Sequence, residues 1–167
     1  MVTVRRLYVD TNVFIRLFEG SDELVDHLRD LFLAERNGGK PFLTTSELTL
    51  AELLVNPYRR NDDKMIQIYD NWTLTNSALE VGPVNRYVLW YAAVLRSQFQ
   101  SLKLPDAIHL STAIGFGCSH FLTADKGIDD HYELMHQRFG SIKGPVRIDI
   151  LRPEIDVVKH LVDEAGR

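Results

Sequence analysis

Four acidic residues of this 167-residue chain occupy positions from which the fold could bring their carboxylates into one site: Asp10, Glu52, Asp106 and Asp125. Asp10 and Asp125 follow short apolar segments typical of buried strands, and Asp106 follows Pro105 at the start of an apolar, helix-like segment. Clustered carboxylates repel one another, so the group is stable only with bound cations or with raised pKa values. Hard divalent cations such as Mg²⁺ or Mn²⁺ choose oxygen ligands of this kind. The set therefore predicts a metal site.

Glu52 is the most informative of the four, because almost every neighbour in the segment 48–55 is apolar. Such a helix is expected to be buried, and a buried glutamate is costly unless it is paired or bound to a metal. Glu47 is the competing residue. It lies beside Ser46, a good helix cap, and its charge suits the first turn of a helix without any metal.

The three aspartates each have an ordinary structural role as well. Asp10 suits an N-cap, Asp106 suits the first turn of a helix, and Asp125 suits a turn before a glycine. Asp129 and Asp130 are rivals of Asp125 for a functional role. The interpretation of these acids as a functional site rests on the four residues as a group. Two of them follow strands, one begins an apolar helix and one lies within another. Further polar residues near these acids are Thr11 and Asn12, which can support Asp10, and His109, which is expected to pack or to make a supporting hydrogen bond.

Alternating strand-like and helix-like segments indicate how these residues are positioned. Apolar patterns predict strands at 5–10, 42–44, 78–81, 120–123 and 146–150, and helices at 12–19, 22–36, 48–55, 58–72, 84–99, 105–114 and 154–163. Asn56-Pro57 is expected to end the third helix. The alternation predicts a single α/β domain over 1–167, a three-layer α/β/α sandwich around a mostly parallel five-stranded sheet. Ligands of such folds bind at the carboxyl ends of the strands.

Composition excludes several other classes of protein. No apolar run approaches the ~20 residues needed to cross a bilayer, so no membrane partner is expected. The lone Cys118 cannot form an internal disulfide, and the chain is expected to be cytoplasmic. The net charge of −4 neither supports nor excludes a nucleic-acid partner, because without the four site carboxylates the acidic and basic residues balance at 19 each.

Four strings carry a resemblance to a known family: LYVDTNVFIRLF, TTSELTLAELL, KLPDAIHLSTAIGFGCSHFLTAD and VRIDILRPE. In this order they resemble PIN-domain ribonucleases, and most of all the VapC-type toxins of toxin–antitoxin pairs. The resemblance implies a PIN-like fold, Mg²⁺ or Mn²⁺ as cofactor, RNA as substrate and an antitoxin protein as a partner. It assigns metal binding and catalysis to Asp10, Glu52, Asp106 and Asp125, with Thr11, Asn12 and Thr123 as polar support. Asp129 stays open as an alternative to Asp125.

Two other functions stay open at this point. One is a non-catalytic PIN-like module that binds RNA or protein. The other is a phosphatase of the haloacid-dehalogenase type, which also begins with an aspartate at a strand end but needs a second acid two residues later, where this chain has Asn12. The amphipathic helices also make a homodimer plausible.

Overall fold

The computed structural model describes residues 3–36, 39–138 and 141–167. The strands among them are β1 (Leu7–Val9), β2 (Leu43–Ser46), β3 (Leu79–Gly82), β4 (His120–Leu122), β5 (His131–Arg138) and β6 (Ser141–Leu151). The helices are α1 (Thr11–Glu19), α2 (Glu23–Leu33), α3 (Glu47–Arg60), α4 (Asp63–Trp72), α5 (Arg86–Gln98), α6 (Leu104–Gly115) and α7 (Ile155–Ala165).

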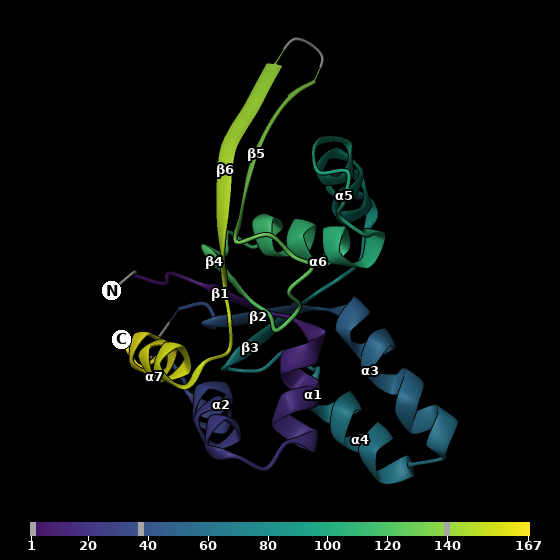
Figure 1. Cartoon of the computed structure of the whole chain (residues 1–167), viewed down its shortest axis with the longest axis vertical. Coiled ribbons are helices and arrows are strands. Elements are labelled where there is room, and N and C mark those ends of the chain that lie inside the picture. Colours follow the sequence, from purple (N-terminus) through teal and green to yellow (C-terminus); the bar gives the residue numbers. More distant parts are fainter. Residues whose placement is uncertain (1–2, 37–38, 139–140) are drawn as a thin grey trace.

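The strands form one sheet in the order β3-β2-β1-β4-β6-β5 (Figure 1). All neighbouring pairs are parallel except β5 and β6, which form an antiparallel hairpin. The predicted class, a mostly parallel sheet between helical layers, is confirmed. The predicted count of five strands is wrong, because β5 was missed and β6 is longer than 146–150. Among the β5 residues whose side chains the structure describes, only Tyr132 and Leu134 are buried, and Gly144-Pro145 inside β6 is typical of a turn.

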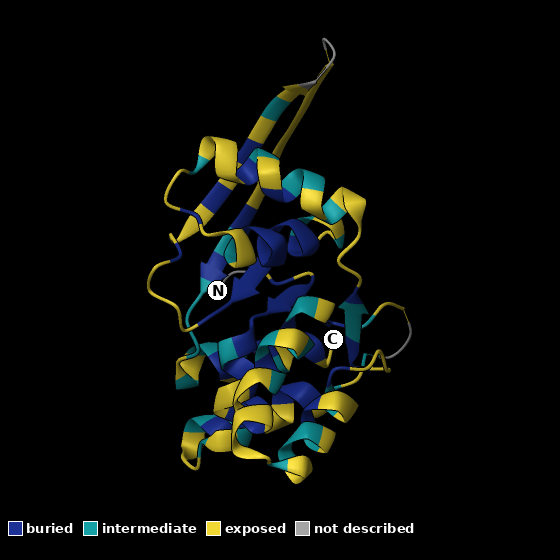
Figure 2. Cartoon of the chain, turned by 90° about the vertical axis from the view of Figure 1, so that its right-hand side faces the viewer, coloured by how far each residue is buried: buried dark blue, intermediate teal, exposed yellow. Residues whose placement is uncertain are grey.

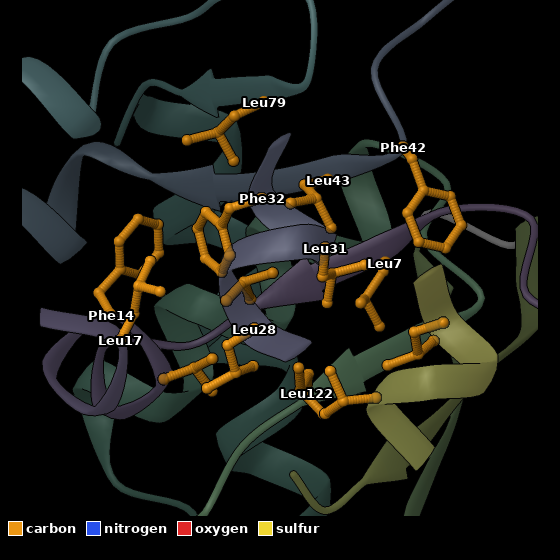
Figure 3. Close-up of a cluster of buried hydrophobic side chains, with 14 of the residues drawn as sticks. Leu7, Phe14, Leu17, Leu28, Leu31, Phe32, Phe42, Leu43, Leu79 and Leu122 are labelled. Atoms are coloured by element: carbon orange, nitrogen blue, oxygen red, sulfur yellow. The ribbon is translucent and has the colours of Figure 1, made fainter. Parts of the chain in front are cut away.

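Side chains alternate between two cores, one on each face of the sheet. Leu7, Val9 and Leu122 pack against α1, α2 and α7 on one face (Figure 3). Tyr8 and Phe121 point to the opposite face, where they meet α5 and α6. The strands at the centre of the molecule are buried (Figure 2). Burial on both faces fixes the register, and therefore fixes where the strand ends lie.

Helix α3 departs from the sequence-based expectation. It begins as predicted, since the Ser46 hydroxyl accepts from the Leu48 N–H, but it continues through Pro57 to Arg60. Pro57 is buried in the helix, and the chain turns only at Asn61, which has a left-handed φ of 51°. The prediction that Asn56-Pro57 ends this helix is wrong, because packing of the buried ring offsets its poor helix propensity.

The β5–β6 hairpin extends well beyond the body of the molecule, and its outer part is exposed (Figures 1 and 2). Residues Ser141–Arg147 of β6 are all exposed. The middle of β5 is anchored to the body, because the Gln98 side chain donates to the Met135 carbonyl at 2.6 Å. No helix among the described residues is long and apolar enough to cross a membrane.

Candidate functional site

An open cleft of about 430 Å³ lies where β1 and β4, neighbours in the sheet, reach their carboxyl ends. All four predicted acids line it, although they come from four separate segments of the chain. Its walls are formed by Asp10, Thr11, Asn12, Ile15, Glu52, Val55, Asn56, Asp106, His109 and Asp125. The topology thus brings the predicted carboxylates together, as expected for ligand sites at the ends of parallel strands.

Asp10 lines this cleft and is only 6% exposed. One carboxylate oxygen accepts from the Thr11 N–H at 2.8 Å, which caps α1. The other accepts from Asn12 Nδ2 and from the Thr123 hydroxyl, both at 2.7 Å. The structure therefore places all three predicted supporting residues around Asp10. Asn12 acts here as a hydrogen-bond donor to the carboxylate, not as the second acid that a haloacid-dehalogenase site needs.

Glu52 reaches the cleft from α3, with its side chain 33% exposed. The premise that this helix is buried on most sides is wrong, since its buried residues are only Thr49, Leu53 and Pro57. Glu52 Oε2 accepts from the Thr11 hydroxyl and from His109 Nε2, the latter at 2.9 Å. Partial burial acts to raise the pKa of Glu52, but these hydrogen bonds and the nearby imidazole outweigh it and lower the pKa.

His109 links Glu52 to Tyr8, which lies in the core between the sheet and α6. The ring is almost fully buried, and its Nδ1 lies 2.7 Å from the Tyr8 hydroxyl. Burial, followed by the charge of Asp10, raises the pKa of Tyr8, so this phenol keeps its proton. Because an ionised Glu52 can only accept, His109 Nε2 carries a hydrogen. The expectation that His109 packs or makes a hydrogen bond is confirmed. Tyr8 was missed, because it resembles any apolar strand residue.

Asp106 and Asp125 complete the acidic wall. Burial, followed by the charges of Asp10 and Asp125, raises the pKa of Asp106. Asp125 is held by its own turn, because Oδ1 accepts from the Gly127 N–H at 2.7 Å and its N–H donates to the Thr123 hydroxyl. Asp129 is exposed and lies outside the lining of the cleft; its N–H donates to the Tyr132 hydroxyl.

The donors in the cleft suit a hard divalent cation. Within the described ranges, no three His, Cys, Asp or Glu side chains are already arranged so that they could hold an ion. The carboxylates of Asp10 and Glu52 are instead turned into hydrogen bonds with neighbouring side chains. Burial, followed by the charges of Asp10 and Asp125, raises the pKa of Asp106, and a bound cation would offset these effects. Oxygen donors of this number and type fit Mg²⁺ or Mn²⁺.

Comparison with family models gives a match to the PIN domain over residues 7–134. This range contains every residue that lines the cleft. No protein with a curated description matches the chain.

Several solved structures share the fold. A toxin–antitoxin complex from Klebsiella pneumoniae matches with a TM-score of 0.51 and 22% identity, covering 72% of this chain and 86% of that one. VapBC2 from Rickettsia felis, bound to a DNA fragment from its promoter, matches with a TM-score of 0.52 and 18% identity, covering 71% and 86%. Mycobacterium tuberculosis VapC20, a toxin that cleaves the sarcin–ricin loop, matches with a TM-score of 0.52 and 18% identity. The match covers 69% of this chain and 86% of that one.

Proposed function

The chain belongs to the PIN domain family, and on that premise we propose that it is a divalent-metal-dependent endoribonuclease that hydrolyses RNA phosphodiester bonds. The observation that carries the proposal is the convergence of Asp10, Glu52, Asp106 and Asp125 on one open cleft. A purely structural role does not explain this convergence, because burial, followed by the charges of Asp10 and Asp125, raises the pKa of Asp106 and so opposes its ionisation.

Each acid has a distinct place in the proposed site. Asp10 and Asp106 are the first choice for direct metal ligands, and Asp125, which lines the same cleft, completes the site. Mg²⁺ or Mn²⁺ held there would supply Lewis-acid stabilisation of the charge that develops on the scissile phosphate. Glu52 keeps its negative charge at neutral pH because its pKa is lowered, so it can ligate directly or orient the attacking water.

The hydrogen bonds around the acids prepare them for this role. Asn12 and Thr123 hold one oxygen of Asp10, and the Thr11 N–H holds the other. Hydrogen-bond partners of this kind limit the orientations that the carboxylate can adopt when a cation binds. His109 and Thr11 orient Glu52 in the same manner.

Basic residues near the cleft bear on how RNA would be bound. Arg16 pairs with Asp22, and Arg60 lies 3.8 Å from Glu19, so part of their charge is compensated within the protein. Lys103 precedes α6, and its charge acts to lower the pKa of Asp106. Lys103 is therefore the basic residue that we favour for contact with the RNA phosphates.

We propose further that the chain is the toxin of a toxin–antitoxin pair. The support is the shared fold with the Klebsiella, Rickettsia and Mycobacterium proteins, together with the sequence strings that carry the four acids. The expected partner is an antitoxin protein that covers the acidic cleft. A homodimer and a cytoplasmic location remain part of this proposal.

Cleavage of RNA by the purified protein tests the catalytic role. We expect cleavage that requires added Mn²⁺ or Mg²⁺ and stops with a chelator. Asp106→Ala should lower the rate by about a hundredfold or more, as does removal of other groups that stabilise developing charge. Asp10→Ala should do the same, although it also removes a helix cap worth about 1 kcal/mol, so its folded fraction must be measured.

Asp129→Ala is the matched control, because Asp129 is an exposed aspartate close to Asp125 but outside the cleft. It should keep the activity of the wild type. If folded Asp106→Ala cleaves RNA at the wild-type rate, the proposed site is wrong. If the wild type binds RNA but does not cleave it in the presence of Mn²⁺, the chain is a binding module instead.

A further inference from the structure

Arg152 makes an unusual set of contacts just beyond the end of β6. Its guanidinium donates to three backbone carbonyls of the segment that follows β4. Nη1 donates to the carbonyls of Thr123 at 3.4 Å and Asp125 at 2.5 Å, and Nη2 donates to that of Ile128 at 2.6 Å. Nη2 also lies 3.6 Å from the carboxylate of Asp130. The side chain is 27% exposed, so these bonds are partly shielded from water.

The sheet brings Arg152 to this position. Leu151 pairs with Leu122 across the parallel strands, and the Thr123 N–H donates to the Leu151 carbonyl at 3.0 Å. Arg152 therefore lies directly beside the first residue after β4. It also lies beyond residues 7–134, the range that the PIN model matches.

The segment held by Arg152 has two sides. Towards the cleft it presents the Asp125 carboxylate and the Thr123 hydroxyl, which donates to Asp10. Away from these groups, three of its carbonyls accept from one guanidinium. A planar guanidinium can donate along several fixed directions at once, whereas an ammonium acts as a compact point charge. Without Arg152, the three carbonyls would lose their shared donor.

We propose that Arg152 is a positioning residue that fixes the segment 123–128 and so holds Asp125 in the acidic cleft. Arg152 itself lines no part of the cleft and so has no expected contact with RNA. Its effect on cleavage, which rests on the proposed function, would pass through Asp125 and Thr123. Its effect on the segment does not depend on that function.

The test compares Arg152→Ala and Arg152→Lys with Arg147→Ala. Arg147 is the matched control, because it is an exposed arginine of the same strand region that bonds to Asp149 within its own strand. Hydrogen exchange of the metal-free proteins reports on the segment directly. In Arg152→Ala, the amides of Asp125, Gly127 and Ile128 should exchange about tenfold faster or more, while the amides of β1 and β4 keep their protection. Arg152→Lys should restore only part of the protection, and Arg147→Ala should leave it unchanged.

RNA cleavage gives the second readout. The Mn²⁺ concentration for half-maximal cleavage should rise about tenfold or more in Arg152→Ala, as for other groups that orient metal ligands. The KM for RNA should change much less, which separates positioning from substrate binding or from a general loss of fold. Arg152→Lys should fall between Arg152→Ala and the wild type.

Unchanged exchange in the segment would overturn the proposal, and so would faster exchange with a wild-type Mn²⁺ dependence. If Arg152→Ala does not fold, Arg152→Lys decides, and wild-type behaviour of that variant in both readouts would overturn the proposal. If the wild type neither binds Mn²⁺ nor cleaves RNA, the proposed function has failed, and the exchange measurement still decides whether Arg152 holds the segment.

Discussion

Asp106 shows at the scale of one residue how the proposed function opposes stability. The side chain is partly buried beside two other aspartates, and each of these effects raises its pKa. Ionisation of Asp106 is therefore less favourable in the folded, metal-free protein than in the unfolded chain, and this difference lowers the free energy of unfolding. Such a site is tolerated where a cation compensates the charge, and stability is often sacrificed in this way at functional sites.

Asp106→Asn should therefore stabilise the metal-free protein at neutral pH. Because the pKa of Asp106 is raised in the folded state, the destabilising effect is present above that pKa and is lost as the pH falls through it towards the ordinary carboxyl value. The melting temperature of the variant should exceed that of the wild type by about 2–4 °C for each kcal/mol gained. The difference should shrink on acidification.

Thermal denaturation from pH 7 down to pH 4, in the presence of a chelator, measures this effect. Asp129→Asn is the control, because its carboxylate is exposed and lies outside the cleft. A variant Asp106→Asn that is less stable than the wild type at pH 7 would contradict the electrostatic account.

Residue by residue, the sequence predicts the acids better than their environment. Asp10 and Asp125 could be placed because each follows a strand, and parallel neighbours end at the same edge. Glu52 was selected for a burial that α3 does not have, and the structure brings it to the candidate site because its side chain lines the cleft. The bond between Tyr8 and His109 joins residues 101 positions apart, and no local pattern indicates it. Arg152 likewise follows a strand, and no local sequence pattern indicates that its guanidinium donates to three backbone carbonyls.

At the scale of elements, α6 holds Asp106 at one end and packs closely against β3 near the other. Gly82, the last residue of β3, is buried, and a Cβ there would lie 2.2 Å from Phe116 Cε2 and 2.9 Å from Thr112 Cγ2. Phe116 cannot easily move away, since Arg6 stacks on its ring and donates to its carbonyl. Only glycine permits this approach of strand and helix.

Gly82→Ala should destabilise the protein by about 1–3 kcal/mol, the usual cost of overpacking a core. Gly115→Ala is the natural comparison, because Gly115 lies in α6 and a Cβ there meets nothing within 4 Å. That variant should be as stable as the wild type, or more stable by up to about 1 kcal/mol, since alanine favours the helix. Equal midpoints of Gly82→Ala and the wild type in urea denaturation would contradict this account of the packing.

The elements also show where sequence patterns fail. Apolar segments identified β1 and β4, whose residues are all buried between the two helical layers. It missed β5, an edge strand with few core contacts, and it misjudged α3, where tertiary packing keeps Pro57 inside a helix. Both errors lie where the structure depends on contacts that are distant in sequence.

For the molecule as a whole, strand order determines the site. Placing β1 beside β4 brings Asp10 and Asp125 together, and α3 and α6 add Glu52 and Asp106 from the flanking layers. The fold class and the gathering of four acids follow from the alternation of strands and helices. The β5–β6 hairpin does not follow from it, because residues 141–147, in the described part of its outer end, are all exposed and show no core pattern in the sequence.

The most direct test of the account is the position of Mn²⁺ in crystals of the wild-type protein soaked with that ion. We expect an anomalous scattering peak in the cleft, within coordination distance of the carboxylate oxygens of Asp10 and Asp106, with Asp125 or Glu52 close by. The same peak should be absent from folded Asp106→Ala crystals soaked in the same way. Mn²⁺ bound only outside this cleft, or no peak in the cleft at saturating Mn²⁺, would contradict the central claim that these carboxylates form a metal centre.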